Sequence, residues 1–239
     1  MTLEKHTASS RGFANHGWLQ ANHSFSFANF YDPNKLNFGA LRVLNDDLIA
    51  PNMGFSTHPH QNMEIITIPL SGVLKHKDNM SNAWLEVRPN EIQVMSAGTG
   101  IYHSEINGSS QEHLSLYQIW ITPDRNDVKP RYNQRYFDQE GRKNKLQVLV
   151  SSIEDDRDDV LKIHQNAQLS RIDLEQDTSF TYQLKSSRHG VYVMMISGCV
   201  TIGKATLNQR DALCVSETTE FTINATEVTE LLFIEVPLV

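Results

Sequence analysis

The chain has few cysteines, a deficit of basic charge and no long apolar run. Its two cysteines, Cys199 and Cys214, lack the Cys-x-x-Cys spacing of zinc and redox sites, so a disulfide framework is not expected. Lysine and arginine number 21 against 28 aspartates and glutamates, and the formal net charge of −7 argues against nonspecific nucleic-acid binding. No segment is apolar enough for a signal peptide or a membrane span. We therefore expect a cytoplasmic protein with no membrane or nucleic-acid partner.

Short apolar segments separated by Gly, Pro and Asn predict an all-β fold of the sandwich or barrel type. The second half of the chain repeats the rhythm of the first, and Ser71-Gly72 and Ser197-Gly198 stand at matching turns. We therefore predict an internal duplication with two β-barrel domains, residues 1–140 and residues 141–239. The second half contains no His-x-His or His-x-Glu, so the second barrel is predicted to lack metal ligands.

Two short motifs indicate a divalent metal site. His58 and His60 are two positions apart, which places both imidazoles on one face of a strand. His103 and Glu105 repeat this spacing and can close the site from a second strand. Three nitrogens and one carboxylate oxygen suit Fe(II), Mn, Co, Ni, Cu or Zn. Glu64 has the same parity as the first two histidines, so the spacing alone leaves open whether Glu64 or Glu105 is the carboxylate ligand.

Residues near the motifs are candidates for the wall of a substrate pocket. Apolar or aromatic side chains beside a metal suit an aromatic ligand, and the candidates are Met53, Phe55, Ile101, Gln118 and Trp120. For Gln118 and Trp120, packing in the core is an equally good interpretation. His23 is interpreted as a strand residue rather than a ligand, and His76, which lacks a partner at ligand spacing, is expected to be a surface or capping residue.

Several segments together resemble the pirins, a family of the cupin superfamily. They run in family order through the first half of the chain: residues 14–19, 23–33, 41–47, 57–64, 95–105 and 116–121. The segment Gly100-Ile101-Tyr102-His103-Ser104-Glu105 has the pirin form, whereas Gly98 stands where most cupins have proline. The resemblance implies a bicupin, with two jelly-roll barrels.

The resemblance also implies a ligand set, namely His58, His60, His103 and Glu105. Glu64 then supports the site by accepting a hydrogen bond from a ligating imidazole, as carboxylates commonly do. The alternative for Glu64 is a buried acid paired with Arg42. Fe(II) is the expected metal, with Mn, Co, Ni, Cu and Zn as alternatives.

Among pirins, the chain is most similar to the bacterial members described as quercetin 2,3-dioxygenases. This similarity implies an enzyme that cleaves the ring of a flavonol with O2 and releases carbon monoxide, with Glu105 as the catalytic acceptor of the hydroxyl proton. The expected partners are the flavonol and O2, and the expected state is a monomer. Two alternatives use the same ligands: a non-enzymatic metal- or redox-responsive regulatory protein, and a metal-assisted isomerase or hydrolase.

Overall fold

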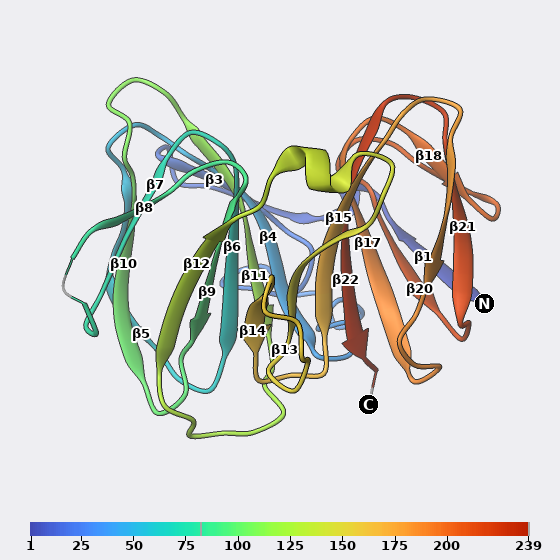
Figure 1. Ribbon diagram of the computed structural model, residues 1–239. Coiled ribbons are helices and arrows are strands. Elements are labelled where there is room, and N and C mark those ends of the chain that lie inside the picture. The colour runs from blue at the N-terminus through green and yellow to red at the C-terminus, as the bar shows by residue number, and fades with distance from the viewer. Residues whose placement is uncertain (82, 239) are drawn as a thin grey trace.

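Two β-barrels stand side by side in the computed structural model, which describes residues 1–81 and 83–238 (Figure 1). Each barrel combines a seven-stranded sheet with a four-stranded sheet. Almost all strand pairs are antiparallel, and alternating buried and exposed positions give each sheet one face toward a core. The predicted all-β architecture of two cupin barrels is confirmed.

The first barrel contains the strands that carry both histidine motifs. Its seven-stranded sheet has the order β12 (Arg131–Tyr136), β9 (Glu91–Ser96), β6 (Glu64–Ser71), β11 (Leu114–Ile121), β4 (Leu41–Ile49), β3 (Leu19–His23) and β2 (Gly12–Asn15). Its four-stranded sheet has the order β5 (Gly54–His60), β10 (Ile101–Asn107), β7 (Leu74–Asp78) and β8 (Leu85–Val87).

The second barrel repeats this arrangement. Its large sheet has the order β1 (Thr2–His6), β20 (Ala212–Ser216), β17 (His189–Ser197), β22 (Thr229–Pro237), β15 (Gln168–Leu174), β13 (Gln147–Ser152) and β14 (Leu161–Ile163). Its small sheet has the order β16 (Ser179–Gln183), β21 (Glu220–Ala225), β18 (Val200–Ile202) and β19 (Ala205–Leu207). Short 3-10 helices are formed by η1 (Ala8–Ser10) and η2 (Gln139–Arg142).

The strand orders support the internal duplication. The order β9-β6-β11-β4 in one large sheet matches β20-β17-β22-β15 in the other, and the small sheets match strand for strand. Gly72 and Gly198 have the same φ of +83°, and a Cβ atom would lie 2.8 Å from the carbonyl oxygen of His113 and 2.3 Å from that of Val228, respectively. Both turns therefore need glycine for the same two reasons, conformation and close approach.

The N-terminal strand belongs to the sheet of the second barrel. β1 pairs with β20, at the edge position that β12 occupies beside β9 in the first barrel. In Figure 1 the blue N-terminal strand accordingly lies among the orange and red strands. The domain limits 1–140 and 141–239 stay a prediction, and β1 is a segment that crosses from one barrel to the other.

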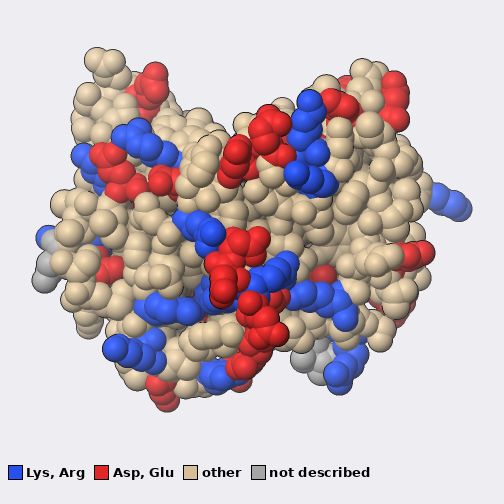
Figure 2. All heavy atoms as spheres, in the orientation of Figure 1, with Lys and Arg blue, Asp and Glu red and all other residues tan. Residues whose placement is uncertain are grey.

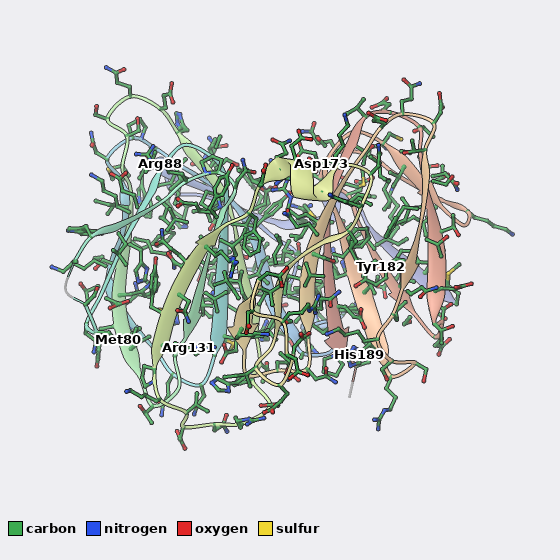
Figure 3. All side chains as sticks on the ribbon, in the orientation of Figure 1. Met80, Arg88, Arg131, Asp173, Tyr182 and His189 are labelled. Atoms are coloured by element: carbon green, nitrogen blue, oxygen red, sulfur yellow. The ribbon has the colours of Figure 1, made fainter. Side chains whose placement is uncertain are left out.

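The barrels share a core between their large sheets. Leu44 and Ile119 of the first barrel belong to one apolar cluster with Tyr192 and Ile234 of the second. At one end of this junction, Arg142 of η2 donates hydrogen bonds to Asn90 of the first barrel and to Asp173 on β15, both at 3.0 Å. Figure 3 shows Asp173 beside the short helix, between the barrels.

The interiors of the barrels differ. In the second barrel, Tyr182 stacks on Phe221 and on Phe233, with ring centroids 5.4 and 4.8 Å apart, and an apolar cluster fills the space. Figure 3 labels Tyr182 and His189 in this barrel. The corresponding space of the first barrel contains imidazoles, carboxyl groups and a cavity.

The surface shows mixed charge. On the face drawn in Figure 2, acidic and basic side chains intermingle along the junction of the barrels. One such cluster in the chain joins Asp155 to Arg157 at 2.5 Å and to Lys185 at 3.5 Å. Cys199 is half-buried and Cys214 buried, and both are free. Within residues 1–81 and 83–238, no helix is long and apolar enough to cross a membrane.

Candidate metal centre

Three imidazoles converge inside the first barrel. His58 and His60 come from β5 and His103 from β10, where His103 pairs with His58 across the two strands. The Nε2 atom of His103 lies 2.9 Å from Nε2 of His58 and 2.9 Å from Nε2 of His60. Two nitrogens bound at right angles to one metal, each about 2.1 Å away, are about 3.0 Å apart. The spacing and the donor type therefore fit a single divalent cation.

The strand pairing that creates this convergence has two local requirements. The pairing of β5 with β10 shifts because β5 has one extra residue between Phe55 and His58, whereas β10 keeps its alternation and turns both His103 and Glu105 into the barrel. Gly54 is also needed, because a Cβ atom there would lie 2.1 Å from the carbonyl oxygen of Glu105. Glycine at position 54 therefore allows β5 and β10 to approach each other closely beside the histidines.

Hydrogen bonds orient the imidazoles. His58 Nδ1 donates to the carbonyl oxygen of Ser56 at 2.8 Å, which leaves the lone pair on Nε2. His103 Nδ1 lies 3.5 Å from Nδ1 of His76, whose Nε2 donates to Asp78 at 3.1 Å. Because a carboxylate can only accept, the network assigns the His103 proton to Nδ1 and again leaves Nε2 free.

His76 is therefore not a surface residue, and that expectation is wrong. Its side chain is fully buried on β7, which pairs with β10, and its ring stacks on Tyr132 with centroids 4.8 Å apart. The signal that could have found it is the spacing of His76 and Asp78, the same two-residue step as in the ligand motifs.

Glu105 lies beside the three histidines and is 3% exposed. Its Oε2 accepts a hydrogen bond from Gln118 Nε2 at 3.1 Å, and its Oε1 faces Gln93 Nε2 at 3.5 Å. With His103 and His76 it forms a second group whose donor atoms lie within 4.8 Å of one another. The two groups share His103, so Glu105 borders the three-histidine centre from one side.

The pKa values suit cation binding. Burial lowers the pKa of His60 and of His103 to about 4, so both are neutral at pH 7. Burial acts to raise the pKa of Glu105, but His76, whose Nδ1 lies 3.9 Å from Oε1, and the positive charge that His103 acquires below its own pKa outweigh burial and lower the pKa of Glu105 to about 2. Neutral imidazoles and an ionised carboxylate are the forms that bind metals.

Glu64 lies apart from this centre. Its Oε2 accepts a hydrogen bond from Ser96 Oγ at 2.7 Å, and it does not line the cavity. Within the described residues, no hydrogen bond joins it to an imidazole of the centre, so its predicted supporting role needs correction. The alternative pairing with Arg42 is wrong too, because Arg42 donates to the carbonyl oxygens of Ser26 and Leu36.

A cavity of about 240 Å³ opens beside the histidines. Phe55, Gln118 and Trp120, all predicted as pocket residues, line it. Met53 and Ile101 do not: Met53 precedes β5 and is 41% exposed, whereas Ile101 is fully buried in an apolar cluster with Ile65. Much of the wall is apolar, and the full lining is Leu19, Ala21, His23, Phe27, Asn45, Asp47, Phe55, His58, His60, Ile65, His103, Glu105, Gln118 and Trp120.

Polar residues on β3 and β4 complete the wall and were missed as site residues. His23 Nδ1 and Asn45 Oδ1 are 2.9 Å apart, and Asp47 lies two residues further along β4. The available signal was the two-residue step between Asn45 and Asp47 within β4, the same spacing as in the ligand motifs. The large sheet thus contributes a second polar group to the cavity, opposite the ligand-bearing small sheet.

Comparisons with known proteins agree with this architecture. Residues 5–121 match the family model described as Pirin, and residues 148–236 match that of the quercetinase C-terminal cupin domain. The chain is 46% identical over 230 residues to a quercetin 2,3-dioxygenase of Escherichia coli strain K12, covering 96% of each chain. The chain belongs to the pirin family.

Two further pirin relatives extend the comparison. A pirin-like protein of Caulobacter vibrioides is 42% identical over 224 residues, covering 94% of this chain and 95% of its own. The crystal structure of the bacterial pirin YhhW of Escherichia coli in complex with nickel(II) superposes with a TM-score of 0.93 at 43% identity, with complete coverage of both chains. The resemblance to pirins inferred from the motifs is thus confirmed over both barrels.

Proposed function

We propose that this pirin is a metal-dependent dioxygenase that cleaves the ring of quercetin-like flavonols with O2 and releases carbon monoxide. The observation that carries the proposal is the direct opening of the three-histidine centre into a cavity with apolar and aromatic walls. Phe27, Phe55 and Trp120 offer ring faces and edges to a flat aromatic ligand. The name of the Escherichia coli relative supports the same substrate class.

His58, His60, His103 and Glu105 would hold the cation. When bound, the cation supplies positive charge that acidifies a hydroxyl group of the ligand. Glu105 is ionised and would accept the hydroxyl proton on a carboxylate oxygen, while the Gln118 amide keeps that carboxylate facing the cavity. The Asp78–His76 pair would hold the ring of His103 in place.

The donor set supports a divalent metal without selecting one. Fe(II) stays the prediction for this chain, and the nickel(II) complex of the relative supports testing nickel beside Fe(II), Mn, Co, Cu and Zn. The monomeric state stays a prediction that size-exclusion chromatography with light scattering can check.

The decisive experiment loads the protein anaerobically with each metal, adds quercetin and then O2, and records flavonol absorbance together with carbon monoxide. We expect carbon monoxide to form in step with quercetin loss, and His58→Ala to abolish both. His113→Ala, an exposed histidine outside the cavity, is the matched control. A filled site that releases no carbon monoxide with any metal would contradict the proposal and favour the regulatory alternative, and turnover without O2 would favour an isomerase or hydrolase.

A further inference from the structure

Asp47 is a buried carboxylic acid on the cavity wall that the metal centre does not use. It is 5% exposed and lies on β4, where Asn45 and Asp47 line the cavity while Leu44 and Asp46 face the second barrel. Asp46, its neighbour, is bound by Arg11 at 3.3 Å and by Arg210 at 3.6 Å. The two adjacent aspartates therefore have opposite surroundings, one ion-paired and one not.

The carboxyl group of Asp47 has no hydrogen-bond partner in the described protein. Its Oδ1 atom is buried without a donor or acceptor in range, and the indole Nε1 of Trp120, on the same cavity wall, is in the same state. Buried polar groups are nearly always paired, because leaving one unpaired costs about 1 to 3 kcal/mol. An unpaired group that lines a cavity is therefore a candidate contact for a ligand.

The fold places Asp47 across the cavity from the histidines. Asp47 pairs with Ala21 on β3 and with Leu116 on β11, all in the large sheet, whereas His58 and His103 belong to the small sheet. The space between the two walls is lined by apolar residues such as Leu19, Ala21 and Ile65. A flat aromatic ligand with one oxygen at the histidines thus has its remote ring near the large sheet.

We propose that Asp47 orients the substrate through a hydrogen bond between its carboxyl group and a phenolic hydroxyl group on the ring remote from the three histidines. The inference rests on the proposed function and deepens it, because it predicts selectivity for flavonols that carry ring hydroxyl groups over those that do not. Trp120 Nε1 supplies an unpaired donor on the same sheet but nearer the metal centre, because the ring of Trp120 meets that of His60 edge-on with centroids 4.9 Å apart.

The protonation state of Asp47 agrees with this role. Burial, with the negative charges of Asp46 and Glu105, raises the pKa of Asp47 to about 8, so the group is a neutral acid at pH 7. A neutral carboxyl group can donate, which a carboxylate cannot. The pKa of Glu105 is lowered instead of raised. The carboxyl group at the histidines can therefore accept a proton, whereas the one across the cavity can donate a hydrogen bond.

The test measures ligand affinity without turnover. Zn(II)-loaded protein is titrated anaerobically, by fluorescence quenching, with quercetin and with 3-hydroxyflavone, which keeps the metal-facing oxygens but lacks the other ring hydroxyls. In Asp47→Leu we expect quercetin to bind about tenfold more weakly and 3-hydroxyflavone to bind within about twofold of wild type. Asp47→Asn, which keeps a neutral donor, should restore quercetin binding.

Thermal unfolding of the same variants separates orientation from structural support. Removing an unpaired buried carboxyl group should leave the midpoint of Asp47→Leu equal to or above that of wild type. Asp46→Leu is the matched control: it breaks the contacts with Arg11 and Arg210, so it should lower the midpoint and leave the quercetin to 3-hydroxyflavone affinity ratio unchanged.

Three results would overturn the inference: unchanged quercetin binding in Asp47→Leu, equal weakening of both flavonols, or a lowered midpoint in that variant. Failure of the proposed function looks different: the wild-type protein would release no carbon monoxide with any metal and, if flavonols are not its ligands at all, would bind neither of them. The absence of binding would contradict both the proposal that flavonols are the substrates and the role of Asp47 in selecting them.

Discussion

His103 faces His58 across the β5–β10 pair, with their Nε2 atoms 2.9 Å apart. Main-chain pairing between two strands, rather than contacts between the side chains themselves, fixes this separation. The imidazoles are therefore held together before any cation binds, which reduces the ordering needed on binding.

Replacement of a converging imidazole should remove the cation. We expect His103→Ala to lower the affinity for Zn(II) or Ni(II) more than about 100-fold, because one of three nitrogens is lost and the remaining two cannot enclose the ion. Isothermal titration calorimetry measures the affinity, and His113→Ala should bind as wild type does. Equal affinity in His103→Ala and wild type would remove this histidine from the ligand set.

The two candidate carboxylates can be distinguished by isosteric amides. Glu105→Gln should keep much of the metal and lose turnover, because the amide cannot accept the hydroxyl proton. Glu64→Gln should retain turnover within about threefold, since Glu64 contacts Ser96 away from the cavity. Metal content by mass spectrometry and quercetin turnover are measured together, and full activity in Glu105→Gln would exclude it from proton transfer.

The Asp78–His76 pair should matter for metal affinity although neither residue is among the three converging histidines. Asp78→Asn weakens the acceptor that fixes the His76 proton, and through His76 the ring of His103. We expect a 10- to 100-fold loss of affinity, typical of groups that orient metal ligands. Because the Asn side-chain oxygen can still accept from the Met80 and Ser81 amides, the β7 turn should stay folded, which circular dichroism checks. Unchanged affinity would show that the pair is only structural.

Asp47 should make the stability of the metal-free protein depend on pH. Its pKa is raised from 3.8 to about 8 on folding, so between these values the native state binds more protons than the unfolded state, and stability falls as pH rises. Relative to Asp47→Asn, wild type should lose about 2 to 3 kcal/mol of unfolding free energy between pH 5 and pH 7. Urea denaturation after chelation measures this difference, and parallel pH profiles of the two proteins would contradict the shift.

The metal motifs could be predicted because their geometry is local. The two-residue steps His58–His60 and His103–Glu105 each lie within one strand, where period-two alternation decides the face. The step His76–Asp78 has the same spacing, but its meaning depends on the pairing of β7 with β10, which spacing within one segment does not reveal.

The expectation for Glu64 failed because the alternation of side chains does not continue from the histidine strand to the next strand. β5 ends at His60 and β6 begins at Glu64, and Asn62 between them has a φ of +48°. The shared parity of Glu64 with the histidines therefore has no consequence across that turn. Gly98, which stands where most cupins have proline, has a φ of +46° and approaches the carbonyl oxygen of Val128, a conformation closed to proline.

Because β1 pairs with β20, the large sheet of the second barrel forms only when segments far apart in the sequence come together. Thr2 pairs with Ser216 and His6 with Ala212, so β1 is synthesised long before the strand with which it pairs. Until the two strands meet, each of them has an unpaired edge. Strand pairs between residues this far apart in sequence form slowly. A genetic cut between the barrels would therefore leave the second half without an edge strand, and co-expressed halves should reassemble only when residues 2–6 are present on one of them.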